Sequence, residues 1–297
     1  MEQEIIVSIC IPAYKRADFL ERCLDSILQQ SFQQYEIVIT DDSPTDELKS
    51  LSGKDERIVY VKNEQPLGSP ANWNKAISLA RGKYIKIMHH DDWFSSPDAL
   101  SRFVQALEEN PSSLFAFSAS RQVGKDNVIN RPILIKKISK LSYVPEILYD
   151  KNYIGAPSVT IFRNNLGLYF DERLIWLVDT EFYIRMLRMN KHFTVINEPL
   201  IDVGLSEFQI TNDCIENSKL VIGEYLYMFK KLSLERNVRD YIVLLDKFAL
   251  YNIFTNEDIM QAGIDATLSS METGIICLLK LKQNIIRYLK QLKRALG

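Results

Sequence analysis

Four adjacent polar residues, His89, His90, Asp91 and Asp92, are the clearest candidates for chemistry in this sequence. They follow an alternating stretch, YIKIM, which predicts a strand that ends just before them. Adjacent carboxylates repel each other, so Asp91 and Asp92 need a cation, hydrogen-bond donors or open solvent. Carboxylate oxygens suit a hard divalent cation such as Mg²⁺ or Mn²⁺. The pair therefore indicates a metal site, and the alternative is a solvated turn or a helix cap.

The two histidines differ from the carboxylates in what they can bind. An imidazole nitrogen is a ligand for several transition metals. Neighbouring residues of a strand point to opposite faces, so both rings cannot easily reach one ion. We expect at least one of the two rings to be packed or hydrogen-bonded instead.

Two further strands end in residues that can contact a ligand. The run IIVSICI, residues 5–11, stops at Pro12, and the run YEIVITDD ends in Asp41 and Asp42. Nearly continuous apolar runs are typical of strands that are buried on both faces of a parallel sheet. Ligands of such sheets bind at the carboxyl ends of the strands. We therefore expect these strand ends to share one edge with the Asp91–Asp92 pair.

Helical patterns separate the strands over the first 110 residues. The first helix is indicated by an apolar face made of Leu20, Leu24, Ile27 and Leu28. Three further helices are indicated by Ser-Pro pairs at their starts, namely Ser43-Pro44, Ser69-Pro70 and Ser96-Pro97. Strands that alternate with helices predict an α/β fold with helices on both sides of the sheet.

The rest of the chain changes in character. Residues 115–205 mix short strands with a hairpin around 124–127, and we expect Pro199 to stop the strand FTVIN. After residue 212 the sequence is almost wholly helical. This organisation predicts one domain at residues 1–211 and a helical C-terminal region at residues 212–297.

Composition is that of an ordinary globular protein. Of 297 residues, 46% are apolar, and 36 basic against 38 acidic residues give a net charge of −2. This balance argues against a nucleic-acid binder. The N-terminus lacks the pattern of a signal peptide and no apolar run approaches a membrane span of about 20 residues, which favours a cytoplasmic protein. The four cysteines have no CxxC spacing, so we expect them to pack rather than to bind metal.

Three blocks of the sequence resemble family 2 glycosyltransferases. In the family's order, they are VSICIPAYKRADFLERCLDSILQQSFQQYEIVITDDSPTDE, PLGSPANWNKAISLARGKYIKIMHHDDWF and FDERLIWLVDTEFYIRML. The resemblance implies the GT-A fold, with a Rossmann-like mixed, mostly parallel sheet flanked by helices. It implies a nucleotide-sugar half at residues 1–110 and an acceptor half at residues 111–211. Residues 212–297 are not covered by it and are expected to be a helical appendage.

The resemblance implies a nucleotide site at the first two strand ends. Pro12, Ala13 and Tyr14 would line the base, and Asp42 would accept a hydrogen bond from its ring NH, which suits uracil. Gly68 would let the backbone pass close to the nucleotide. The alternatives are a core aromatic role for Tyr14, a helix cap for Asp42 and an ordinary turn for Gly68.

For the diphosphate, the resemblance implies a metal site with one departure from the family pattern. Asp91 and Asp92 would hold Mn²⁺ or Mg²⁺, and Asp91 would also contact the ribose-diphosphate. Many relatives read Asp-x-Asp-Asp, whereas His89 stands here in place of the first aspartate. Asp92 would then be the principal ligand, in a site that is weaker or relies partly on other groups.

A second departure concerns the other contacts to the donor. Relatives often carry an Arg-x-His group after the strand ending in EPL, whereas this chain reads IDVGLSEFQIT. The leaving group would then rely on the metal and on donors such as Arg16 or Lys75. Asn74 is a further candidate for donor binding, and the alternative is that it faces solvent from its helix.

The resemblance of the third block implies that Asp179 is the catalytic base. It precedes an aromatic-rich helix, and its alternative role is the N-cap of that helix. As a base it would take the proton of an acceptor hydroxyl while that oxygen attacks the anomeric carbon. One carboxylate and one displacement would invert the anomeric configuration. Glu181, further along the helix, is expected to be structural.

The C-terminal stretch GIICLLKLKQNIIRYLKQLKRALG has apolar residues at helical spacing, six basic residues and no acidic ones. Such a basic amphipathic helix suits an anionic membrane surface. The alternative is a helix that packs on the rest of the protein with its basic face in water.

These observations together predict a metal-dependent inverting glycosyltransferase. It would move a sugar from a nucleotide-sugar, preferably a UDP-sugar, to a glycan or lipid-linked hydroxyl in polysaccharide biosynthesis. It would be cytoplasmic, with contact to the inner membrane face if the last helix binds lipid, and the oligomeric state is open. The alternatives are a non-catalytic nucleotide-sugar-binding protein with the same fold and, with less support, a sugar nucleotidyltransferase.

Overall fold

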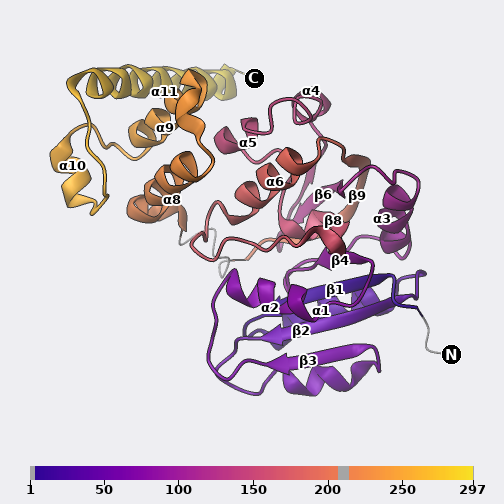
Figure 1. The fold of residues 1–297 in the computed structure, drawn as a ribbon. Coiled ribbons are helices and arrows are strands. Elements are labelled where there is room, and N and C mark those ends of the chain that lie inside the picture. Colours follow the sequence, from indigo (N-terminus) through magenta and orange to yellow (C-terminus); the bar gives the residue numbers. More distant parts are fainter. Residues whose placement is uncertain (1–3, 207–213, 297) are drawn as a thin grey trace. The chain divides into compact units, whose positions relative to one another are not determined.

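The computed structural model describes residues 4–206 and 214–296, and the side chains of the last helix as far as residue 291 (Figure 1). The chain forms two compact units, Met1–Glu207 and Phe208–Gly297. The predicted domain boundary between residues 211 and 212 lies outside the described residues.

A mixed sheet forms the centre of the first unit. Within the described residues it has nine strands, in the order β3-β2-β1-β4-β8-β6-β9-β5 with β7 paired to β6. Strands β3, β2, β1 and β4 are parallel, whereas β8 is antiparallel to both β4 and β6. The strands are β1 Val7–Ala13, β2 Tyr35–Asp41, β3 Ile58–Lys62, β4 Tyr84–Ile87, β5 Trp93–Phe94, β6 Phe115–Val123, β7 Val128–Arg131, β8 Thr160–Arg163 and β9 Thr194–Gly204.

Helices cover the sheet because each has one apolar face. Helix α1 buries Leu20, Cys23, Leu24 and Ile27, and α3 buries Leu100, Phe103 and Leu107. Helix α2 packs on β1 and β2, and α3 on β6 and β9. The helical elements of this unit are α1 Ala17–Leu28, η1 Lys49–Lys54, α2 Ala71–Leu79, α3 Ala99–Glu108, α4 Ile135–Ile138, α5 Ile147–Asp150, η2 Pro157–Val159, η3 Asn164–Leu166 and α6 Val178–Met189.

Strand register brings the predicted strand ends to one edge. Pro12 pairs with Thr40 and Ala13 with Asp41, so β1 and β2 end side by side. On its other side β1 pairs in parallel with β4, whose end leads into His89. The predicted α/β sheet with parallel strands is therefore confirmed, and the ends of β1, β2 and β4 lie at the same edge.

Two local predictions were wrong. The helix expected at Ser43-Pro44 does not form, because the Ser43 hydroxyl instead accepts a hydrogen bond from the Lys15 N–H, at 2.6 Å. Only the 3₁₀ helix η1 follows. Strand β9 also continues through Pro199, where its register with β6 shifts. Proline has no N–H to donate, and it is tolerated there because the pairing with β6 is irregular at this position.

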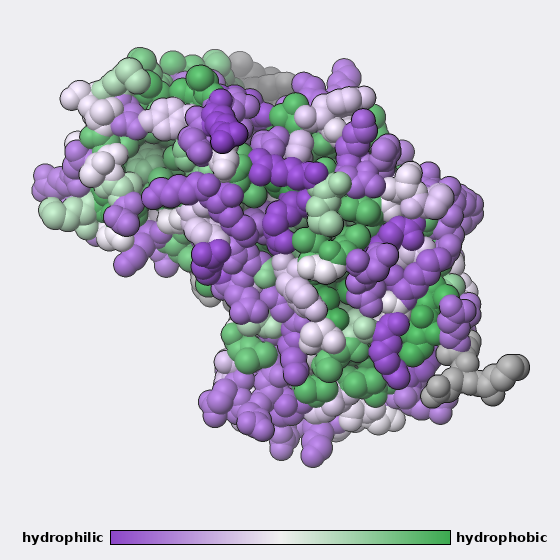
Figure 2. Space-filling view, viewed as in Figure 1, coloured by the Kyte–Doolittle hydropathy of each residue, from purple (hydrophilic) through white to green (hydrophobic). Residues whose placement is uncertain are grey.

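The second unit is helical, as expected. Its elements are α8 Ser218–Lys231, η4 Leu234–Arg236, α9 Val238–Leu250, α10 Asn256–Gln261 and α11 Ser270–Leu296. Helix α11 packs on α9, and hydrophobic residues gather along its opposite, outer side at the upper edge of Figure 2. In the described parts of the chain, no helix is both long and apolar enough to cross a membrane.

Candidate active site

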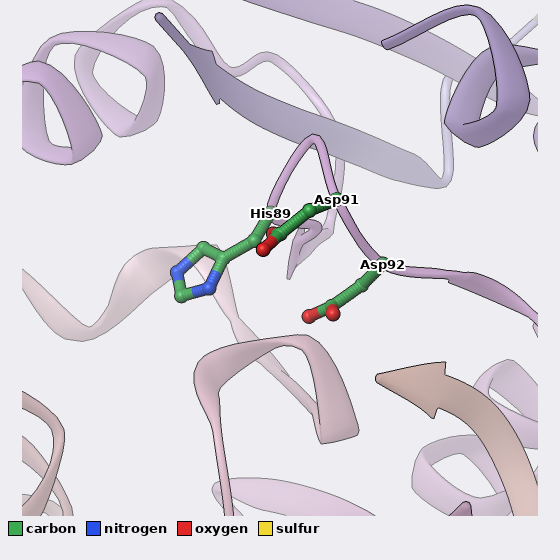
Figure 3. Close-up of side chains that lie close together, drawn as sticks. All are labelled: His89, Asp91 and Asp92. Carbon is green, nitrogen blue, oxygen red and sulfur yellow. The ribbon is translucent and has the colours of Figure 1, made fainter. Parts of the chain in front are cut away.

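The turn between β4 and β5 carries the group that the sequence indicated as a metal site. Donor atoms of His89, Asp91 and Asp92 all lie within 4.8 Å of one another. Figure 3 shows the imidazole and the two carboxylates on the same side of the turn. Because the turn follows a parallel strand, the peptide backbone positions all three groups at the carboxyl end of β4.

Asp92 is the more buried of the two carboxylates. Its Oδ1 accepts a hydrogen bond from the Gly204 N–H at 3.1 Å, and its carboxylate accepts a second from the Ser158 hydroxyl. Burial and the neighbouring Asp91 raise the pKa of Asp92 well above its usual value. A cation bound between the carboxylates would reverse this effect, because it stabilises their charged forms.

The backbone of Asp91 is held from two other elements. Its carbonyl accepts a hydrogen bond from Arg22 Nη2 on α1, at 3.0 Å, and the Arg22 guanidinium lies 3.9 Å from the centre of the Trp93 ring. Gly204, at the end of β9, comes so close that a Cβ there would lie 2.4 Å from the same carbonyl oxygen. The acidic turn is therefore clamped between α1 and the end of β9.

A buried cation lies beneath the acidic turn. Lys86 on β4 is fully buried, and its ammonium donates to the carbonyls of Ile87, at 3.0 Å, and Ser158. Burial lowers the pKa of Lys86 to about 7, and the attraction of Asp92 opposes that shift. Ser158 thus contacts Lys86 through its carbonyl and Asp92 through its hydroxyl.

The two histidines have different surroundings. Burial lowers the pKa of His89, so its imidazole is neutral at neutral pH, the form that binds metals. Its ring packs against Trp73, with 4.7 Å between ring centres and a tilt of 47°, and within the described structure its buried Nε2 has no hydrogen-bond partner. His90 lies instead beside Phe19, with 6.2 Å between ring centres. Of the two histidines, His89 lies with the acidic group, and His90 packs against Phe19.

Asp42 connects the end of β2 to the loop before α2. Its Oδ1 accepts hydrogen bonds from Asn63 Nδ2 at 2.6 Å and the Leu67 N–H at 3.1 Å, and its Oδ2 accepts one from the Gly68 N–H at 2.8 Å. Gly68 has a φ of 76°, a conformation that favours glycine. Two residues that the sequence assigned to nucleotide binding therefore bind each other.

The end of β1 also places its predicted residues together. Ala13 accepts a hydrogen bond from the Asp42 N–H at 3.0 Å, and Tyr14 beyond it is 48% exposed, which excludes a core role. Lys15 and Arg16 both have left-handed backbones, with φ of 52° and 56°. Such strained residues cluster at functional sites. The Arg16 guanidinium pairs with Asp18, 2.7 Å away, beside this edge.

The structure gives two other candidates on α2 different surroundings. Asn74 does not face solvent. Its amide donates to the Phe170 carbonyl at 2.9 Å and to Glu172 Oε1 at 3.0 Å, and accepts from the Phe170 N–H at 2.8 Å. Both amide protons are used within the protein, so Asn74 ties α2 to the segment before α6. Lys75, its neighbour, is exposed.

Asp179 lies in the first turn of α6 and is not its N-cap. The N-cap is Leu177, and no side chain caps the helix. The carboxylate accepts hydrogen bonds from the Thr180 N–H at 2.7 Å and from Asn152 Nδ2 at 2.8 Å. Burial raises the pKa of Asp179 to about 6, while these hydrogen bonds act in the opposite direction. Glu181 is buried and pairs with Arg185, as expected of a structural residue.

One short segment, residues 152–158, contacts both acidic centres. Asn152 at its start donates to Asp179, and Ser158 at its end donates to Asp92. Gly155 between them has a φ of 119°, and its carbonyl accepts from the Asn152 amide. Sequence reasoning missed Asn152 and Ser158, although a glycine and a proline in IGAPSV signalled an irregular turn.

Comparison with known proteins identifies the family. Residues 8–180, more than half of the chain, match the model of Glycosyl transferase family 2. This chain therefore belongs to glycosyl transferase family 2. The match contains the acidic turn, the predicted nucleotide residues and Asp179.

Curated relatives cover part of the chain. The UDP-Glc:alpha-D-GlcNAc-diphosphoundecaprenol beta-1,3-glucosyltransferase WfaP of Escherichia coli is 36% identical over 167 residues, 55% of this chain and 62% of that enzyme. An uncharacterized protein of Mycobacterium tuberculosis is 31% identical over 202 residues, 61% of this chain and 62% of that protein. The chain thus spans less than two thirds of the length of these relatives.

Solved structures support the fold. TarS residues 1–349 of S. aureus, in complex with UDP-GlcNAc, has a TM-score of 0.59 at 16% identity, over 94% of this chain and 89% of that one. The mannosyltransferase PcManGT of Pyrobaculum calidifontis, in complex with GDP-Man and Mn²⁺, has a TM-score of 0.56 at 16% identity, over 96% and 81%. At these identities the likeness concerns the fold alone.

Proposed function

We propose that this protein is a metal-dependent inverting glycosyltransferase that moves a sugar from a UDP-sugar to a hydroxyl group. The observation that carries the proposal is the arrangement of the acidic turn, residues 89–92, beside the ends of β1 and β2 in a member of glycosyl transferase family 2. A nucleotide at that edge would have its base near Tyr14 and Asp42 and its diphosphate toward Asp91 and Asp92.

A divalent cation fits the acidic turn. Two carboxylates and a neutral imidazole lie within reach of one ion, and the raised pKa of Asp92 indicates that its negative charge is poorly balanced without one. Asp91 and Asp92 would hold Mn²⁺ or Mg²⁺, and such an ion would neutralise the charge of the departing nucleoside diphosphate. PcManGT, a structural neighbour, was solved with Mn²⁺.

Asp179 is the proposed general base. Its carboxylate has a pKa of about 6, close to the pH at which it would act, as an efficient base requires. It would accept the proton of the acceptor hydroxyl as that oxygen forms a bond to the anomeric carbon. The bond from that carbon to the diphosphate oxygen breaks in the same step, so the configuration inverts. Asn152 would hold the carboxylate in place.

The nature of both substrates is inferred from chemistry and from relatives. The first half of the chain, residues 1–110, would bind the donor, and residues 111–211 the acceptor. WfaP is named for UDP-Glc as donor and a diphosphoundecaprenol-linked sugar as acceptor. We propose the same classes here, namely a UDP-sugar and a glycan or lipid-linked hydroxyl in polysaccharide biosynthesis.

Release of UDP from a panel of UDP-sugars, with water as acceptor, tests catalysis. With Mn²⁺ present we expect turnover of at least one donor, and NMR should show that the released sugar initially has the opposite anomeric configuration. Asp179→Asn should lower turnover by about 100-fold or more while UDP affinity stays near that of the wild type. The matched control is Asp126→Asn, in the exposed hairpin turn. Unaltered turnover in Asp179→Asn would remove this residue as the base.

A further inference from the structure

Helix α11 carries a stripe of apolar side chains with no cover in the described structure. Leu278, Leu281, Ile285 and Leu289 are 69%, 58%, 51% and 56% exposed. Their spacing of three and four residues places them on one face of the helix. Exposed apolar residues that are scattered singly are common, but a continuous stripe marks an interaction surface. We call these four residues the outer stripe.

The outer stripe is not the face that packs on α9. Gln283 makes that contact, because its Nε2 donates to the Asp246 carbonyl at 3.1 Å and to its carboxylate at 3.0 Å, and Ile276 near the start of α11 is fully buried. At 100° per residue, Ile276 and Gln283 lie roughly opposite the centre of the outer stripe. Packing within the second unit therefore anchors α11 and leaves the stripe exposed, as Figure 2 shows along its outer side.

Charge along α11 favours one kind of partner. Glu272 is the last acidic residue of the chain, and from there to the end the sequence has only basic charges: Lys280, Lys282, Arg287, Lys290, Lys293 and Arg294. A second copy of α11 laid against the outer stripe would bring two basic helices together, and like charges repel. An anionic lipid surface instead accepts apolar side chains and attracts the net positive charge of the helix, to which Lys282 contributes beside the stripe.

We propose that the outer stripe of α11 docks the protein onto an anionic membrane surface. The helix lies parallel to that surface, with Leu281 and Ile285 among the acyl chains and residues such as Lys282 at the phosphate groups. Helix α11 has 27 residues and is about 40 Å long, so it can make a line of contacts along the membrane surface without crossing the bilayer. The outer stripe shares no residue with the proposed active site.

Co-sedimentation of the full-length protein with lipid vesicles tests the proposal. Wild type should bind vesicles of phosphatidylcholine mixed with phosphatidylglycerol. Its affinity for vesicles of phosphatidylcholine alone should be lower by more than about tenfold, and its affinity for the mixed vesicles should fall as salt is added. The double variant Leu281→Gln, Ile285→Gln should lower binding more than about tenfold, because it removes two apolar side chains that insert among the acyl chains in the bound state. Lys282→Gln, beside the stripe, should lower binding mainly at low salt, whereas Arg287→Gln, on the side of the helix that also carries Ile276 and Gln283, should lower it less.

Matched controls separate docking from unfolding and from self-association. Val238→Gln and Met260→Gln alter apolar side chains of the same unit that are 78% and 73% exposed but lie outside the outer stripe, so they should bind like wild type. Circular dichroism and UDP affinity should be unchanged in all variants. The proposal is overturned if wild type ignores phosphatidylglycerol, if the stripe variant binds like wild type, or if the same substitutions instead dissociate a dimer in analytical ultracentrifugation.

Discussion

Burial raises the pKa of Asp179 to about 6, and this sets the expected pH dependence of sugar transfer. A general base must be deprotonated, so its active fraction is nearly complete above its pKa and falls as the pH drops through it. We expect kcat/KM to be level near pH 8 and to fall about tenfold for each pH unit below about 6. A profile that stays level well below pH 6 would contradict the assignment of Asp179.

Two variants of Asn152 connect that profile to a particular hydrogen bond. Asn152 donates to Asp179 Oδ2 and so favours the charged carboxylate. Asn152→Ala should move the acid limb to higher pH. Asn152→Asp should move it further, because a carboxylate there repels Asp179, while it can still accept the N–H groups of Ile154 and Gly155. Identical acid limbs in all three proteins would show that Asn152 does not act on the base.

The residues named from the sequence differ in how far the structure supports them. Asp91 and Asp92 could be singled out because two carboxylates beside a strand end are a local signal, and Asp179 because its block resembles the family; their roles stay predictions. Ser158 and Arg22 could not, because each contacts the acidic turn from a distant part of the chain: Arg22 is 69 residues from Asp91. Asn74 was assigned to the donor, yet its amide pairs within the protein.

At the scale of elements, the end of β9 shapes the acidic turn. Gly204 donates to Asp92 and leaves no room for a Cβ beside the Asp91 carbonyl. Gly204→Ala should push β9 away from the turn, because a 2.4 Å contact between a Cβ and a backbone oxygen cannot persist. We expect the enhancement of UDP binding by Mn²⁺ to fall by more than about tenfold, a loss typical of overpacking at a tight contact.

The control for Gly204→Ala is Gly223→Ala, in α8, where nothing lies within 4 Å of the added Cβ. That variant should bind UDP and Mn²⁺ as wild type does, and its unfolding free energy should change by no more than about 1 kcal/mol. Calorimetry measures binding and thermal unfolding checks the fold. Normal metal-enhanced binding by Gly204→Ala would show that the end of β9 does not position the turn.

Helices and strands were predictable where a local sequence pattern determines them, and less so where pairing with a distant strand or backbone group determines their bounds. The alternation of strands and helices predicted β1 to β4 and their parallel direction, because each strand is a short apolar run between helical faces. Strand β9 was expected to stop at Pro199 but continues to Gly204, since pairing with β6 and β5 sustains it on both sides. The helix at Ser43 fails for a similar reason, because its hydroxyl bonds a distant backbone group.

At the scale of the whole molecule, the predicted catalytic residues all belong to the first unit. The family match ends at residue 180, so it does not include the second unit. Three sequence blocks in order, each with its own local pattern, made the fold predictable. The helical second unit is not covered by the resemblance to the family. Its role therefore had to be inferred from the charge of α11 and from the face of that helix that stays exposed.

Calorimetric titration with UDP, in the presence and absence of Mn²⁺, tests the central claim most directly. The claim is that Asp91 and Asp92 bind a nucleoside diphosphate through a divalent cation. Wild type should bind UDP more than about tenfold more tightly with Mn²⁺, because the ion offsets the charge of both carboxylates and diphosphate. Asp92→Asn should lose that enhancement and keep the weaker, metal-independent binding. UDP binding by the wild type that is indifferent to Mn²⁺ would contradict the claim.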